Sequence, residues 1–380
     1  MNIKYFDNAA TTQMKKEVLE EMMPYLDDEY GNPSSIHLKG ISAKSAIESA
    51  REKIAKAINA EKEEIYFTSG GSEADNMALK GFARANKKRG KHIITTQIEH
   101  KAILETCKEL EEEGFEISYI SVDKYGVVNL KELKDSIKQN TILISVMFAN
   151  NEIGTIQPID EIGKIAEEHN IAFHTDAVQA IGNIDIDVKK SKIDMLSMSS
   201  HKFYGPKGIG CLYVDKKIKF NAIINGGGQE KNKRSGTENV ANIVGMGKAI
   251  EISTEKIKEY NEKLYALSTS FLNEMKKYFG SVILNGHPIK RLKGNVNISL
   301  KDVDGESLLL LLSERGMCIS TASACGSNNK KYSHVLKAIG LTAEEARGTI
   351  RITFGENNTI KDTILLAKNI KSIIEKLEKM

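Results

Sequence analysis

The sequence of 380 residues has little proline and almost no net charge, and each shortage excludes a class of protein. It contains five prolines and no tract rich in Pro, Gly or Ser, so it offers no obvious flexible linker. The 54 Lys and Arg residues nearly balance the 51 Asp and Glu residues and leave a formal net charge of +3. This balance predicts neither a nucleic acid nor a membrane surface as a partner.

Long apolar runs and paired cysteines are also absent. No stretch approaches about 18 uninterrupted apolar residues, and residues 1–7 (MNIKYFD) lack the apolar core of a signal peptide. Cys107, Cys211, Cys318 and Cys325 show neither CxxC pairing nor a zinc-like spacing with histidine. We therefore expect free thiols in a reducing compartment, and a soluble, cytoplasmic protein.

Strands alternate with helices through the first half of the chain. Short apolar runs near residues 65–67, 92–95, 116–120, 142–146, 171–174 and 195–198 are separated by segments of helical period. Such alternation predicts a mostly parallel sheet covered on both faces.

The composition changes after residue 240, where a long helical stretch to about residue 279 is rich in Glu and Lys. Shorter strands and helices follow, as in a smaller α+β domain. Because single cores stop growing near roughly 250 to 300 residues, we expect two domains. The large one would span residues 13–254, and the small one would combine residues 1–12 with residues 255–380.

Lys202 lies in a short polar loop, residues 199–208 (SSHKFYGPKG), between two apolar runs. A lysine held there loses hydration, so its pKa falls and the neutral amine can attack a carbonyl carbon to form a Schiff base. Ser199 and His201 offer hydrogen-bond donors for an anion. The alternative is an ordinary solvated lysine, and motifs elsewhere in the chain decide between the two.

Polar residues follow other strands too, at the ends where parallel sheets bind ligands. Residues 67–76 (FTSGGSEADN) form a strand, a glycine turn and a helix start, and we expect Ser72 to cap that helix in a site suited to a phosphate. Asp176 ends another strand and can pair with a protonated pyridine nitrogen, with Gln179 one turn later. An ordinary helix cap is the alternative for Asp176.

Four further residues are candidates for the site. His100 can stack on a flat ring or carry protons, or it can cap a surface helix. Asn151, in a polar turn after a strand, can reach a substrate or cofactor. Arg351 can hold a carboxylate or form a structural salt bridge. Cys325, in the small and polar residues 320–331, is either an exposed nucleophile or a bystander thiol.

These motifs, in this order, resemble those of the cysteine desulfurases, which are class-V, fold-type I pyridoxal phosphate enzymes. The resemblance runs from residues 7–12 (DNAATT) to about Phe354. It rests on residues 99–102 (EHKA), 150–154 (NNEIG), 175–179 (TDAVQ), 200–202 (SHK), 205–208 (GPKG) and 234–239 (RSGTEN). The long cysteine loop, followed by SHVL, resembles that of the subgroup that supplies sulfur for iron–sulfur clusters and related pathways. Residues 321–329 and 231–233 depart from the usual family form and leave the sulfur acceptor open.

The resemblance implies an α/β fold, with a large domain built on a mostly parallel seven-stranded sheet flanked by helices and a smaller α+β C-terminal domain. Lys202 would form an aldimine with pyridoxal 5'-phosphate, Asp176 would hold the pyridinium, Gln179 would bond the ring oxygen and His100 would stack over the ring. The phosphate would be bound by Gly71, Ser72, Ser199, His201 and, from the neighbouring subunit, Thr237.

The substrate implied by the resemblance is L-cysteine, with its carboxylate held by Asn151 and Arg351. Cys325 would attack the substrate sulfur and leave L-alanine and a persulfide. The active unit would be a homodimer that passes sulfur to an acceptor protein, such as an iron–sulfur scaffold or a thiolation enzyme. No metal is expected in the catalytic step, although Cys325 could transiently ligate a nascent cluster.

Other functions fit parts of the same pattern. A selenocysteine lyase of this fold needs the same cofactor groups but depends less on Cys325. An aminotransferase of this fold would form pyruvate from alanine. A cofactor-free scaffold that binds sulfur acceptors is disfavoured because Lys202, Asp176 and Gln179 are present together.

Overall fold

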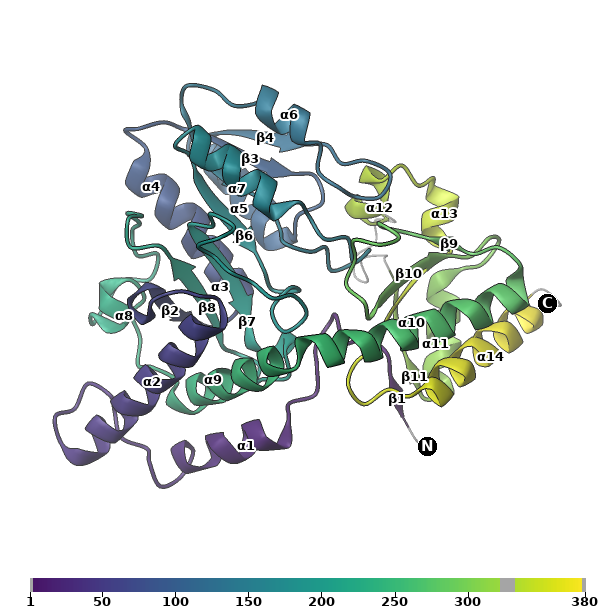
Figure 1. Cartoon of the computed structure of the whole chain (residues 1–380), viewed down its shortest axis with the longest axis horizontal. Coiled ribbons are helices and arrows are strands. Elements are labelled where there is room, and N and C mark those ends of the chain that lie inside the picture. Colours follow the sequence, from purple (N-terminus) through teal and green to yellow (C-terminus); the bar gives the residue numbers. More distant parts are fainter. Residues whose placement is uncertain (1–2, 322–331, 378–380) are drawn as a thin grey trace.

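The computed structural model describes residues 3–321 and 332–377. Cys325 therefore lies outside the described residues, as does most of the polar segment around it. Within the described ranges, an α/β part carries a seven-stranded sheet and a second part carries a four-stranded sheet (Figure 1).

The large sheet confirms the expected mostly parallel arrangement. Its strands, in spatial order, are β2 (Ile65–Thr68), β8 (Gly210–Val214), β7 (Met195–Ser199), β6 (Ala172–Asp176), β5 (Thr141–Ser145), β3 (His92–Thr96) and β4 (Glu116–Ile120). Only β8 runs against its neighbours in this sheet, pairing antiparallel with both β7 and β2. The carboxyl ends of the other strands therefore meet at one edge.

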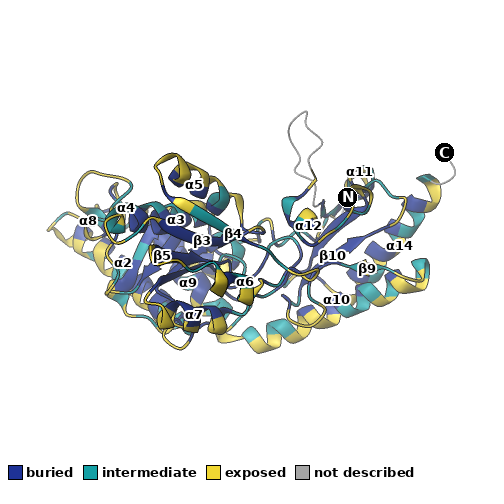
Figure 2. Cartoon of the chain, turned by 90° about the horizontal axis from the view of Figure 1, so that it is seen from above, coloured by how far each residue is buried: buried dark blue, intermediate teal, exposed yellow. Residues whose placement is uncertain are grey.

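Helices cover both faces of this sheet. The helices of this part are α1 (Lys16–Met22), α2 (Leu38–Ala57), α3 (Gly71–Asn76), α4 (Phe82–Asn86), α5 (Lys101–Glu112), α6 (Leu130–Asp135), α7 (Ile159–Glu168), α8 (Gln229–Asn232) and α9 (Val240–Glu255). Successive strand residues face opposite sides. Ile93 of β3 packs in a core with α3, α4 and α5, whereas Ile94 packs in a core with α2, α7 and α9. The strands β3, β5, β6, β7 and β8 between the two cores are buried along their whole length, whereas the edge strand β4 is mostly half-buried (Figure 2).

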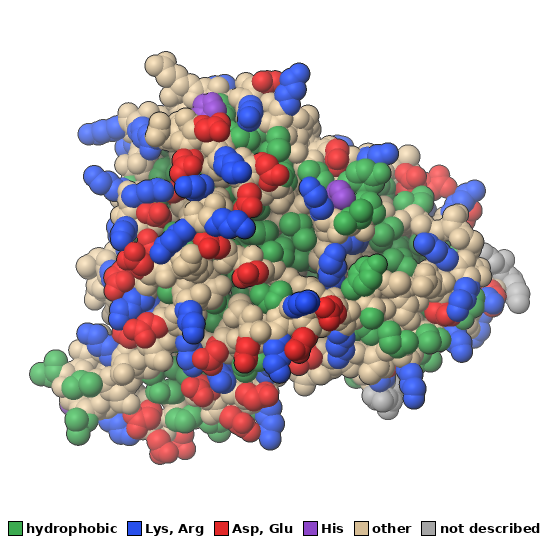
Figure 3. Space-filling view, viewed as in Figure 1, with side chains coloured by type: hydrophobic (Ala, Val, Ile, Leu, Met, Phe, Trp, Pro, Cys, Tyr) green, Lys and Arg blue, Asp and Glu red, His purple; other side chains and the backbone are tan. Residues whose placement is uncertain are grey.

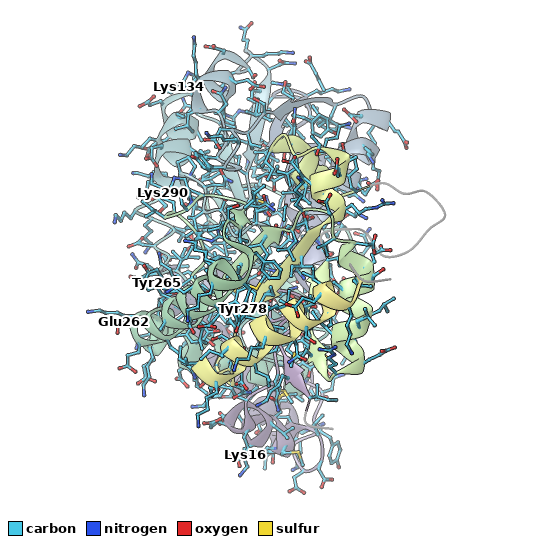
Figure 4. The ribbon with its side chains drawn as sticks, turned by 90° about the vertical axis from the view of Figure 1, so that its right-hand side faces the viewer. Lys16, Lys134, Glu262, Tyr265, Tyr278 and Lys290 are labelled. Atoms are coloured by element: carbon cyan, nitrogen blue, oxygen red, sulfur yellow. The ribbon has the colours of Figure 1, made fainter. Side chains whose placement is uncertain are left out.

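The second part forms around an antiparallel sheet of order β12-β13-β10-β9. Its elements are α10 (Ile257–Phe279), β9 (Ile283–Leu284), β10 (Asn295–Ser299), α11 (Gly305–Glu314), β11 (Met317–Cys318), β12 (Ser320–Thr321), α12 (His334–Ala338), α13 (Ala343–Arg347), β13 (Thr349–Thr353) and α14 (Ile360–Leu377). The N-terminal strand β1 (Lys4–Tyr5) pairs with β11. Figure 4 shows α14 alongside α10, and Lys371 of α14 lies 5.0 Å from the ring centroid of the labelled Tyr278.

The long helical stretch expected over residues 240–279 is two helices. Lys256 separates α9 from α10 with φ −125° and ψ 31°, which are not helical angles. The apolar core around α10 and α14 is distinct from the two cores of the large sheet. A domain boundary near residue 255 remains a prediction that this break supports.

The surface matches the balanced composition. On the face in Figure 3, basic and acidic side chains alternate rather than gathering in patches of one sign. Of the helices in the described ranges, none combines the length and the apolar character that crossing a bilayer requires.

Candidate active site

The carboxyl ends of the parallel strands enclose a cavity of about 260 Å³. Every predicted cofactor-binding residue except Thr237 lines it, together with Asp75, Met147, Ala149 and Val178. Residues that are more than 100 positions apart in the sequence are thus brought together, because each follows a strand of the same sheet.

Lys202 ends the short 3-10 helix Ser200–Lys202 that follows β7. Its Nζ donates hydrogen bonds to the carbonyl oxygens of Ala9, at 2.6 Å, and Ala10, at 2.8 Å. Burial, with a smaller effect of the positive charge of Arg351, lowers the pKa of Lys202 to about 8. The amine therefore becomes a nucleophile at a lower pH than an exposed lysine does.

Asp176 is the last residue of β6 and is buried at the cavity. Its Oδ1 accepts a hydrogen bond from the backbone N–H of Val178 at 2.9 Å. Burial raises the pKa of Asp176, and this hydrogen bond opposes the shift. Gln179 also faces the cavity, and its Nε2 donates to the carbonyl oxygen of Ala9 at 3.0 Å.

The glycine turn before α3 differs from the expected cap. The helix begins at Gly71 with Gly70 as its N-cap, so the expectation that Ser72 caps it is wrong, and Ser72 is the second helical residue. The helix thus begins two residues earlier than expected, with a glycine at its crowded first position. A Cβ on Gly71 would lie 2.7 Å from Cγ2 of Val178, so only glycine fits there without a shift. Ser72 nevertheless lines the cavity.

Ser199 and His201 lie on the other wall of the cavity, at the end of β7. The Nδ1 of His201 lies 3.1 Å from Oγ1 of Thr11. Burial and the nearby charges of Lys202 and Lys207 lower the pKa of His201 to about 4. His201 is therefore neutral at physiological pH.

His100 combines its two interpretations. It lines the cavity, and it also caps α5, since its Nδ1 accepts a hydrogen bond from the backbone N–H of Ala102 at 3.2 Å. Loss of surrounding water lowers the pKa of His100 although the residue keeps an exposed edge, and the charge of Asp176 opposes the shift.

Arg351 of β13 reaches the same region from the small sheet. Its Nη2 pairs with Oδ1 of Asp7 at 2.8 Å, and its Nη1 donates to the carbonyl oxygen of Asn151 at 3.1 Å. Its Nε is buried and, among the described residues, has no hydrogen-bond partner. Arg351 thus forms the predicted structural salt bridge, and among the described residues its Nε–H has no acceptor.

Two predicted residues do not join this group within the described chain. Thr237 is exposed in the loop between α8 and α9 and does not line the cavity. A buried ion pair between Arg51 and Glu230, at 2.8 Å, holds α8 just before this loop, and Arg234 holds the loop itself through its Nε, which donates to Glu73 at 2.7 Å. Cys325 lies outside the described residues.

Asp75 also lines the cavity, although it was not among the residues predicted from the sequence. The signal was present in its spacing, because Asp75 follows Gly71 by four positions and Ser72 by three, which places it on the same helix face. His174 was not among them either, although it precedes Asp176 by two positions in β6 and therefore points to the same side of the sheet.

Comparisons with known proteins place the chain among relatives along nearly its whole length. The family model described as Aminotransferase class-V matches residues 4–366. A cysteine desulfurase IscS from Methanosarcina thermophila is 52% identical over 376 residues, covering 99% of this chain and 93% of the relative. A cysteine desulfurase IscS from Clostridium botulinum (strain Hall) is 52% identical over 378 residues, covering 99% and 95%.

Solved structures agree with these relatives. A NifS-like protein matches with a TM-score of 0.93 and 39% identity, covering 98% of this chain and 100% of that one. A structure of SspA in complex with cysteine matches with a TM-score of 0.83 and 41% identity, covering 94% and 100%. The chain therefore belongs to the class-V aminotransferase family, among its cysteine desulfurases.

Proposed function

We propose that this protein is a pyridoxal-phosphate-dependent cysteine desulfurase, which moves sulfur from L-cysteine to Cys325 and releases L-alanine. The observation that carries the proposal is the single cavity that holds Lys202, Asp176, Gln179 and His100 at the ends of parallel strands. Relatives that are 52% identical over the full chain bear the same enzyme name.

The residues of the cavity fit this cofactor. Asp176 is a buried acid at the cavity wall, and a protonated ring nitrogen would supply the positive partner that a buried carboxylate needs. Lys202 is an amine with a pKa of about 8, which suits covalent capture of an aldehyde. When bound, pyridoxal phosphate would supply an electron-accepting ring that weakens bonds at the α-carbon of the substrate.

Each residue then has a role of its own. Asp176 would keep the ring nitrogen protonated, Gln179 would donate to the ring oxygen, and His100 would lie against the ring. Lys202 would hold the cofactor and, as a free amine, would move the proton at the α-carbon of the substrate. The phosphate would be held by Gly71, Ser72, Ser199, His201 and, from the neighbouring subunit, Thr237.

The substrate carboxylate is held by the Asn151 side chain and by Arg351, whose buried Nε has no hydrogen-bond partner among the described residues. The Cys325 thiolate attacks the substrate sulfur and forms an S–S bond as the C–S bond breaks. The carbon side gains a proton and leaves as alanine. An acceptor thiol, on an iron–sulfur scaffold or a thiolation enzyme, then takes the outer sulfur from Cys325. The proposal includes a homodimer and a cytoplasmic location, where reducing conditions keep Cys325 a thiol.

The test adds L-cysteine and a reductant to the purified protein loaded with pyridoxal phosphate, and measures sulfide and alanine. We expect equal amounts of both from the parent and loss of both from Cys325→Ala, which should keep the colour of the bound cofactor. Cys318→Ala, at a half-buried thiol in β11, is the matched control and should keep parental rates. Parental sulfide release by Cys325→Ala would contradict the proposal and favour a selenocysteine lyase.

A further inference from the structure

Asp75 is a buried carboxyl in the cavity that the proposed chemistry does not use. It lies on α3 with 1% of its surface exposed and lines the cavity together with Asp176. Its Oδ1 is buried and has no hydrogen-bond partner among the residues that the structure describes. The Ser197 hydroxyl is its hydrogen-bonding neighbour on β7. A buried polar atom without a partner lowers the stability of the fold, so we expect Oδ1 of Asp75 to have a functional role.

Among the described residues, no lysine or arginine forms an ion pair with Asp75. The nearest ring nitrogen, Nε2 of His174, lies 3.8 Å from Oδ1, but complete burial lowers the pKa of His174 to about 3 and leaves it neutral. The His174 ring lies between two hydroxyls, with Nδ1 2.9 Å from Oγ of Ser145 and Nε2 3.0 Å from Oγ of Ser197.

Two acids and two bases are the other titratable groups around Asp75. Asp176 and Glu99 are acids, and the Glu99 oxygens already accept hydrogen bonds from Thr96 and from the backbone N–H of Met147. Lys202 and His100 line the same cavity. The Lys202 amine donates to backbone carbonyls of the N-terminal segment, and His100 Nδ1 accepts from its own helix.

The positive charge of Lys202, which lines the same cavity, favours one carboxylate at Asp176, and burial disfavours a second negative charge beside it, so the pair of carboxyls keeps one proton. Under the proposed function, on which this inference rests, Asp176 must carry the charge that pairs with the ring nitrogen. The proton then belongs to Asp75. Burial and the charge of Asp176 raise the pKa of Asp75 well above its usual range, in agreement with this assignment.

We propose that Asp75 is a positioning residue of the cofactor site, which remains the neutral acid and donates its O–H within the cavity while Asp176 carries the negative charge. The carboxylate of Asp176 is the strongest acceptor there. Asp75 thus acts on the cofactor through Asp176.

Three variants test this assignment through the dissociation constant of pyridoxal phosphate, measured by absorbance titration of the apoprotein. Asp75→Asn keeps a neutral donor of the same shape and should bind within about threefold of the parent. Asp75→Leu removes the donor and should bind at least about tenfold more weakly, the worth of one hydrogen bond to a charged group. Asp176→Asn is the reference and should bind more weakly still.

Two results would overturn the proposal. If Asp75→Asn bound pyridoxal phosphate as weakly as Asp75→Leu, a charge would be needed at residue 75. If Asp75→Leu bound it as tightly as the parent, Asp75 would have no role in cofactor binding. If the parent itself failed to bind pyridoxal phosphate, the proposed function would fall instead. Thermal unfolding of each apoprotein checks that the variants fold.

An infrared measurement tests the protonation state even without cofactor. The spectrum of the parent minus that of Asp75→Asn, at pH 7 before and after addition of pyridoxal phosphate, should contain the C=O band of a protonated carboxylic acid. A carboxylate band in its place would overturn the proposal, whether or not Asp75→Leu folds.

Discussion

At the scale of single residues, the Lys202 amine shows how burial and a neighbouring charge set reactivity. Its pKa of about 8 means that roughly one molecule in ten carries the neutral amine at pH 7, far more than for a solvated lysine. Two carbonyl oxygens hold Nζ in place and orient it, while burial makes the amine easier to deprotonate.

We therefore predict that the rate at which the apoprotein captures pyridoxal phosphate rises about tenfold from pH 7 and levels off above about pH 9. Stopped-flow absorbance measures this rate. Because the charge of Arg351 helps to lower the pKa of Lys202, Arg351→Gln should move the midpoint to higher pH. A parental rate that kept rising beyond pH 10 would show an ordinary lysine.

The residues that could be predicted from sequence are those that carry a local signal. Lys202, Asp176 and His100 each follow an apolar strand, and the sheet then brings them to one edge. The spacing of Asp75 from Gly71 and Ser72 places it at the cavity, but its significance comes from acids on other elements, which no local pattern reveals. Likewise, no glycine or proline marks Lys256, where the long helix is interrupted.

At the scale of elements, α12 connects the small sheet to the loops of the cavity. Ser333, its N-cap, accepts hydrogen bonds from two backbone N–H groups of the helix and donates to Oε2 of Glu152 at 2.5 Å. Nε2 of His334 lies 2.9 Å from the carbonyl oxygen of Glu99. Glu152 and Glu99 directly neighbour Asn151 and His100, so α12 contacts the supports of two site residues.

Cys325 precedes Ser333 by eight positions, and we expect α12 to anchor the chain that follows the cysteine. We predict that Ser333→Ala lowers the free energy of unfolding by roughly 1 kcal/mol, the usual worth of a cap. It should also lower sulfide release several-fold while the affinity for pyridoxal phosphate stays unchanged. Urea unfolding, the sulfide assay and absorbance titration measure the three quantities.

The matched control is Thr342→Ala, which removes the cap of α13 without touching the cavity loops. It should cost similar stability and leave sulfide release at the parental rate. If both variants reduced sulfide release equally, the effect would be one of general stability, and the anchoring role of Ser333 would be refuted.

At the scale of the whole molecule, Thr237 is exposed on a firmly held loop, away from the cavity of its own chain. This is the position expected of a residue that completes the site of a neighbouring subunit. A contact between Thr237 and the cavity of a neighbouring subunit cannot be predicted from the sequence or described in one chain, because it depends on how two subunits pack.

We predict that mixed dimers of Lys202→Ala and Thr237→Ala recover activity. One of the two sites in each mixed dimer has both residues, so an equal mixture should reach about a quarter of the parental rate. Co-expression with two affinity tags and the sulfide assay provide the measurement. Mixing Lys202→Ala with Asp176→Asn, two residues of the same site, should recover nothing. Activity equal to the mean of the separate variants would place Thr237 in its own chain or outside the site.

The pairing of the two ends of the chain has a consequence for biosynthesis. Asp7 forms an ion pair with Arg351 across 344 positions, and Ala9, two residues later, accepts hydrogen bonds from Lys202 and Gln179. A growing chain on the ribosome folds its N-terminal part first. Residues 7–10 have no strand β13 to pair with until residue 353 has emerged, so the nascent protein completes its cofactor cavity only when translation is nearly over.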